Sequence, residues 1–167
     1  MNARLKTTLK AWPVIAAAII AVCLATGIVA GWAGINLQEQ QHVDIARQIL
    51  AHAFASWRHF GAAAFFVVEV VAVMPCLEEI VFRWLLFRLP AKRPGKFSAA
   101  IAILSSSLFS AVHYIVQPFP DNAFIALFFF GLAQCWLYRR TERLWCPMLN
   151  HALFNLTNLA LLPLVSA

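Results

Sequence analysis

The chain has 167 residues, of which 62% are hydrophobic and 12% are charged, and its formal net charge is +6. Soluble domains are roughly 45–50% apolar and about 25% charged, so this composition excludes an ordinary soluble domain. The basic residues stand in short clusters between apolar runs, where they set membrane topology, and this arrangement does not indicate a nucleic-acid partner. We expect one integral-membrane domain over residues 1–167, an all-α bundle of about five transmembrane helices plus one interfacial amphipathic helix.

The first apolar run is free of charge from Ala11 to Ile35 and follows three basic residues near the N-terminus. The run is longer than the roughly 7–15 apolar residues of a signal peptide, so it predicts a retained transmembrane helix. Residues 36–60 are the most polar part of the chain, but their apolar side chains recur close to a helical period. This pattern predicts an amphipathic helix at the membrane surface.

Four further apolar runs predict the remaining spans. They cover residues 61–87, 97–117, 123–138 and 144–164, and we expect the first of them to bend at Pro75. Basic clusters occur at the N-terminus, in residues 88–96 and in residues 139–143, whereas the segments between the other spans are balanced or acidic. Because Lys and Arg are enriched on the cytoplasmic side, this alternation places the N-terminus in the cytoplasm.

Charged residues concentrate at membrane depth in the second span. Each charge facing lipid would cost about 2.5–3.5 kcal/mol, so Glu78, Glu79 and Arg83 are expected to face the protein interior. Glu79 and Arg83 share a helix face and are expected to pair, with a purely structural ion pair as the alternative to a functional one. Glu78 points about 100° away and has no local partner. A third acid, Glu69, is expected to pair elsewhere in the bundle.

Two more polar patterns occur within apolar spans. The third span contains Phe109-x-x-x-His113, and the fifth contains His151-x-x-x-Asn155. The second pattern places an imidazole and an amide on one helix face. Ionisable groups in membrane helices are functional candidates, and their occurrence on three different helices is typical of a site assembled inside a bundle.

These groups provide the parts needed to hydrolyse an amide bond. A glutamate among apolar side chains, with a histidine opposite, can hold and deprotonate a water molecule, a role for which Glu78 and His113 are candidates. His151 and Asn155 offer N–H donors for a developing oxyanion. A metal remains an alternative, because Glu78, His113 and His151 could bind zinc or another divalent ion, although the HExxH pattern is absent.

The three patterns, in this order and each on its own span, resemble those of the CAAX-protease and bacteriocin-processing family of intramembrane endopeptidases. The resemblance covers about residues 61–160, the expected catalytic core. It implies a helical bundle in the inner membrane of a bacterium, which cleaves a membrane-embedded or membrane-anchored protein. The implied substrates are bacteriocin precursors or proteins with C-terminal sorting or anchor segments, and nothing in this short chain implies a prenylated substrate.

The resemblance also implies residue roles. Glu78 and His113 take the family's water-activating positions, and His151 and Asn155 take its oxyanion positions. The implied mechanism is of the glutamic type, without a metal cofactor. The remaining matched positions, a second acid and its basic partner, are Glu79 and Arg83.

Two alternatives belong to other functional classes. A non-catalytic immunity or partner protein would keep the same fold without cleaving a peptide bond. An ion-coupled transporter would use Glu69, Glu78 and the histidines as a relay. The absence of an inverted sequence repeat argues against the transporter.

Overall fold

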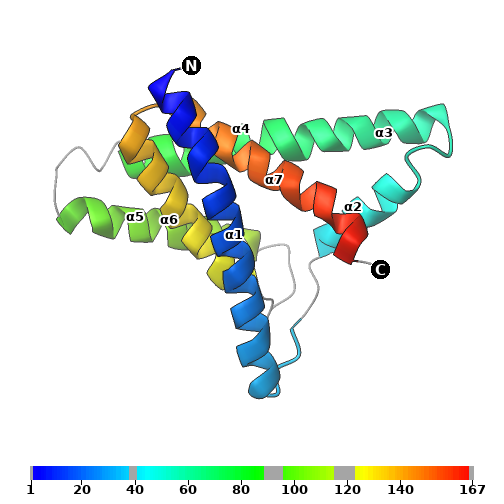
Figure 1. The fold of residues 1–167 in the computed structure, drawn as a ribbon, viewed down its shortest axis with the longest axis horizontal. Coiled ribbons are helices and arrows are strands. Elements are labelled where there is room, and N and C mark those ends of the chain that lie inside the picture. Colours follow the sequence, from blue (N-terminus) through cyan, green and yellow to red (C-terminus); the bar gives the residue numbers. More distant parts are fainter. Residues whose placement is uncertain (1, 38–40, 89–95, 115–122, 166–167) are drawn as a thin grey trace.

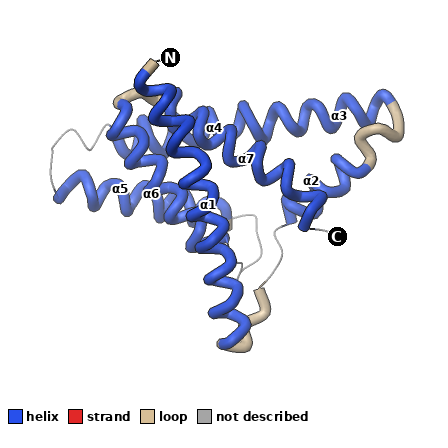
Figure 2. The backbone as a smooth tube through the Cα atoms, in the orientation of Figure 1, coloured by secondary structure: helices blue, strands red, loops and turns tan. Residues whose placement is uncertain are grey.

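The computed structural model describes residues 2–37, 41–88, 96–114 and 123–165. Every regular element in these ranges is a helix, which confirms the predicted all-α class (Figure 2). The α-helices are α1 (Ala3–Trp32), α2 (Gln41–Ala51), α3 (Trp57–Val68), α4 (Met74–Glu79), α5 (Lys96–His113), α6 (Ala123–Thr141) and α7 (Trp145–Val165). Two π-helical segments, η1 (Glu69–Val73) and η2 (Ile80–Arg88), flank α4.

Two helices are long and apolar enough to cross a membrane. They are α1 and the continuous helix Trp57–Arg88, which contains α3, η1, α4 and η2. The apolar stretch Ser98–Val112 of α5 is shorter. The structure therefore supports two of the predicted spans by length and composition, and the count of about five stays a prediction. The expected basic loop at 88–96 and the segment 117–122 lie largely outside the described residues.

The polar segment before the second span is not one helix, which corrects the prediction for residues 36–60. Helix α2 ends at Ala51, and a new helix begins at Trp57 after a short turn. Ser56 causes the break, because its backbone is extended and its side chain accepts a hydrogen bond from the His59 N–H. Trp57 to Phe60 therefore belong to the long second helix rather than to the amphipathic one.

The π-helical segment η1 precedes the proline of the second span. Proline lacks an N–H, and its ring would clash with the carbonyl four residues earlier in an α-helix. In η1 the Met74 N–H instead bonds the Glu69 carbonyl, five residues back. A widened turn of this kind lets the helix continue through Pro75 to Glu78 and Glu79.

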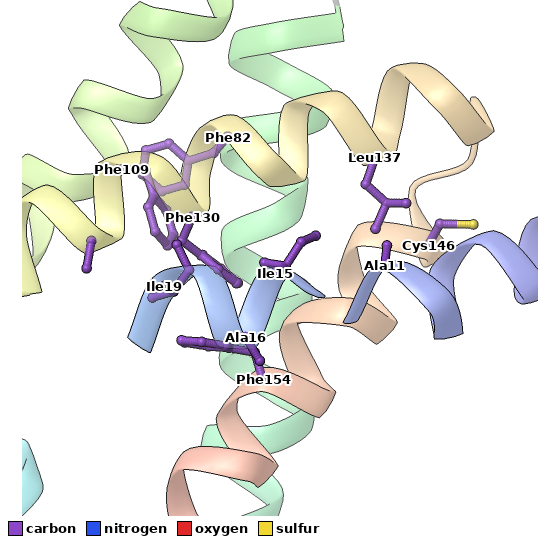
Figure 3. Close-up of a cluster of buried hydrophobic side chains, with 11 residues drawn as sticks. Ala11, Ile15, Ala16, Ile19, Phe82, Phe109, Phe130, Leu137, Cys146 and Phe154 are labelled. Atoms are coloured by element: carbon purple, nitrogen blue, oxygen red, sulfur yellow. The ribbon is translucent and has the colours of Figure 1, made fainter. Parts of the chain in front are cut away.

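The helices that carry the expected motifs pack into one bundle. Helix α1 lies against α6 and α7, α5 lies against α6 and η2, and α7 contacts η1, α4 and α6 (Figure 1). Phe82, Phe109 and Phe130 meet in the apolar core between these helices (Figure 3). Helices α5 and α6 approach closely at Gly131, where an added Cβ would lie 2.9 Å from the Ser106 Cβ.

Candidate active site

The centre of the site is an ion pair within one helix. Arg83 Nε lies 3.0 Å from Glu79 Oε2, and both side chains are fully buried. The i,i+4 spacing predicted this pairing, and the structure confirms it. Since the pair is removed from solvent, the negative charge of Glu79 is balanced locally, which a buried carboxylate requires.

A histidine from another helix bridges the two glutamates. His151 Nδ1 lies 2.9 Å from Glu79 Oε1, although the residues are 72 positions apart. The other ring nitrogen, Nε2, lies 3.5 Å from Glu78 Oε2. A carboxylate oxygen only accepts hydrogen bonds, so the contact with Glu79 places a hydrogen on Nδ1 and directs Nε2 at Glu78.

The two glutamates differ in their surroundings. The side chain of Glu79 is fully buried, whereas that of Glu78 is 20% exposed. Adjacent residues on a helix point about 100° apart, which explains why one faces the bundle interior and the other faces its edge. Glu78 is therefore the acid that a substrate or a water molecule can reach.

Aromatic rings enclose the buried part of the site. The Phe109 ring lies 4.9 Å from the Arg83 guanidinium carbon and 6.0 Å from the His151 ring. Phe130 contacts the His151 ring edge-on, with the ring centroids 4.9 Å apart. These contacts stabilise the guanidinium through cation–π attraction and keep water away from the Glu79 side of His151.

His113 lies next to the same aromatic residue but not on a glutamate. Its Nδ1 is 2.8 Å from the Phe109 carbonyl, and its ring centroid is 4.9 Å from the Phe109 ring. A carbonyl accepts, so Nδ1 donates and Nε2 keeps its lone pair. Within the described residues, Phe109 connects His113 to His151. The expected role of His113, which is to hold a water molecule together with Glu78, stays a prediction.

Asn155 is one helical turn beyond His151 on α7. Its Nδ2 donates a hydrogen bond of 2.9 Å to the Val70 carbonyl in η1. Glu69, the neighbouring acid, is half-buried. The six sequence-predicted residues thus lie in one region, where Glu78, Glu79, Arg83 and His151 are in direct contact.

Sequence reasoning missed a second buried polar pair. Gln134 Nε2 donates to Asn150 Oδ1 over 2.8 Å, and both side chains are fully buried. Asn150 immediately precedes His151, so this bond anchors α7 to α6 beside the site. The available signal was the presence of an uncharged amide in the middle of each of two apolar runs.

The chain resembles known proteins over the same region. Residues 59–157 match the model of the type II CAAX prenyl endopeptidase Rce1-like family. Over 95 residues the chain is 30% identical to a protein of Bacillus subtilis (strain 168) named "Putative membrane peptidase YdiL". That match covers 56% of this chain and 36% of the Bacillus protein, so the chain spans little more than a third of that relative. No solved structure matches.

Proposed function

Since the chain belongs to the type II CAAX prenyl endopeptidase Rce1-like family, we propose that it is an intramembrane endopeptidase. The observation that carries the proposal is the contact between Glu78 and His151, which two distant helices bring together inside an apolar bundle. The apolar helices and the family make the chain an integral membrane protein. Its substrate is proposed to be a membrane-embedded or membrane-anchored protein, such as a bacteriocin precursor or a protein with a C-terminal sorting or anchor segment.

Glu78 and His113 form the water-activating side of the proposed site. Glu78 is partly exposed and acts as the general base that takes a proton from water. The lone pair on His113 Nε2 accepts the second hydrogen bond of that water, because Nδ1 is already committed to the Phe109 carbonyl. The water oxygen then bonds to the scissile carbonyl carbon, and its proton moves to Glu78.

His151 is the proposed donor to the oxyanion. Nδ1 of His151 keeps its contact with Glu79, so Nε2 is the ring nitrogen that would supply the donor. Once Glu78 has taken the proton of the water, the Nε2–H of His151, which lies 3.5 Å from Glu78 Oε2, stabilises the negative oxygen of the tetrahedral intermediate. When the intermediate collapses, the C–N bond breaks and the leaving amine takes the proton from Glu78.

The family resemblance pairs Asn155 with His151 as a second oxyanion donor. One hydrogen of the Asn155 amide is committed to the Val70 carbonyl. The second hydrogen of the same nitrogen is the one that this role would use. The proposed oxyanion site therefore needs Asn155 to bond the substrate and Val70 at the same time.

The proposed topology follows the distribution of basic residues. With five spans and the N-terminus in the cytoplasm, the segments 88–96 and 139–143 both face the cytoplasm, as the enrichment of Lys and Arg requires. The C-terminal end of α6 carries part of this charge, and Arg139 and Arg140 are exposed there. The proposed location is the inner membrane of a bacterium.

A metal-dependent mechanism would use Glu78, His113 and His151 as ligands. In the described part of the chain, no three acidic, histidine or cysteine side chains converge in a geometry suited to a metal ion. His113 and His151 each bond one ring nitrogen within the protein, and the Nε2 atoms would be the ones to hold a metal. We therefore derive no catalytic step through a metal, and a chelator tests this directly.

The proposal is tested by comparing protein termini in membranes from cells that express the chain, its Glu78→Gln variant or an Asp44→Asn control. Asp44 is an exposed acid on α2 that takes no part in the proposed site. We expect new termini with the native chain and the control, and none with Glu78→Gln. Loss of these termini with a chelator would establish the metal-dependent mechanism instead.

If Glu78→Gln leaves every terminus unchanged while the folded variant still confers a phenotype such as bacteriocin resistance, the chain is not a peptidase. That result would favour the non-catalytic immunity or partner protein.

A further inference from the structure

The π-helical register of η1 leaves the Val70 carbonyl without its regular backbone donor, because the sequence has a proline at the donor position. In η1 the hydrogen bonds run from an N–H to the carbonyl five residues back, as Met74 N–H to Glu69 O shows. By the same register, the Val70 carbonyl would receive the N–H of residue 75. That residue is Pro75, which has none.

A side chain from α7 replaces the missing backbone donor. Asn155 Nδ2 reaches the Val70 carbonyl over 2.9 Å, across 85 positions of sequence. Pro75 is fully buried, and both Val70 and Asn155 are half-buried. A carbonyl left without a donor in such surroundings pays the cost of losing its hydrogen bonds to water, and the bond to Asn155 removes that penalty.

The bond joins the two segments on which the site depends. Val70 lies two turns before Glu78 along the second helix, and Asn155 lies one turn after His151 on α7. The Asn155–Val70 bond therefore runs beside the His151 contacts with Glu78 and Glu79 and fixes how far α7 can slide against α4.

We propose that Asn155 is a positioning residue, which sets the distance between Glu78 and His151 by holding the Val70 carbonyl that Pro75 leaves open. This inference rests on the proposed peptidase function for its catalytic consequence. The structural part of the inference, that the effect of Asn155 depends on residue 75, does not rest on the proposed function. The oxyanion role by itself carries no such dependence, because a hydrogen bond from Asn155 to the substrate is indifferent to the N–H of residue 75.

The test is a double-mutant cycle between positions 155 and 75 in the full chain, reconstituted in lipid bilayers. Asn155→Leu removes the donor at similar volume, and Pro75→Ala supplies the missing N–H. The cycle is read by thermal unfolding, and by kcat and KM on a membrane-anchored reporter that the native chain cleaves and Glu78→Gln does not. Pro75→Gly supplies the same N–H without a Cβ, so Asn155→Leu is also measured in that variant.

We expect Asn155→Leu to lower kcat about a hundredfold with Pro75 present, as a shift of about 1 Å in a catalytic pair does, with KM little changed. In the Pro75→Ala or Pro75→Gly background, the loss of kcat on the same substitution should be at least about fivefold smaller, because the backbone N–H now holds the Val70 carbonyl and only the contact with the substrate oxyanion is lost. The unfolding temperature should fall on Asn155→Leu only when Pro75 is retained.

Equal losses of kcat in all backgrounds, with no effect of residue 75 on the unfolding temperature, would overturn the proposal and leave Asn155 with the oxyanion role alone. If no peptidase activity is found, the unfolding cycle still decides the positioning role. A failure of the proposed function is thereby distinguished from a failure of this inference.

Discussion

Helix α2 and the α4–η2 segment each contain an ion pair of almost the same length. Arg47 and Asp44 are 2.9 Å apart, and Arg83 and Glu79 are 3.0 Å apart. The first pair has side chains 34% and 52% exposed, whereas the second is fully buried. An exposed pair contributes roughly 0–1 kcal/mol, but removing one partner of a buried pair costs about 3–5 kcal/mol. The contribution of an ion pair with one-turn spacing to the free energy of unfolding therefore depends on whether the pair is exposed or buried.

The largest effect is expected when the buried pair is broken. Arg83→Met leaves Glu79 charged and without its partner in the apolar core, which should lower the free energy of unfolding by about 3–5 kcal/mol. Thermal or denaturant unfolding in a detergent or bilayer measures this loss. The double variant Glu79→Leu, Arg83→Leu should recover most of it, because no charge then stays buried. Stability unchanged in Arg83→Met would mean that the pair is not desolvated.

An intermediate effect is expected from packing beside the same pair. Gly131→Ala places a Cβ 2.9 Å from that of Ser106 and forces α5 and α6 apart, which should cost about 1–3 kcal/mol. Gly27→Ala on α1 is the matched control, because no atom lies within 4 Å of the added Cβ. The control should be neutral or slightly stabilising. Equal losses in both variants would show that α5 and α6 are not closely packed at Gly131.

The smallest effect is expected at the exposed pair. Asp44→Asn removes the charge from a pair open to solvent, so the free energy of unfolding should change by less than about 1 kcal/mol. Raising the salt concentration should shrink even this difference, since salt screens exposed charges. A loss comparable to that of Arg83→Met would contradict the energetic distinction between the two pairs.

Local sequence spacing could predict contacts within a helix but not between helices. Glu79 and Arg83 are one turn apart, so their pairing follows from helical geometry alone. His151 reaches both glutamates only because α7 packs on α4, and spacing along the chain carries no information about that packing. The family patterns predicted that these residues belong to one site, but they did not predict which side chains contact one another.

Two other features show where the sequence signal was present and not used. Ser56 is a residue type that begins helices, so the break between α2 and α3 was open to prediction from the N-cap preference. Pro75 predicted a disturbed backbone, and a bend was expected. The π-helical segment before Pro75, and the need of Val70 for a donor from α7, depend on tertiary structure.

The central claim is that Glu78 performs chemistry while Glu79 holds the site together, and one pair of isosteric substitutions tests it. Cleavage of the reporter and the unfolding temperature are measured side by side for Glu78→Gln and Glu79→Gln. We predict that Glu78→Gln lowers cleavage by at least about a hundredfold, the usual contribution of a general base, without lowering the unfolding temperature. Glu79→Gln should lower the unfolding temperature, because Arg83 and His151 lose their charged partner. Retained cleavage in Glu78→Gln, or an undiminished unfolding temperature in Glu79→Gln, would contradict the account.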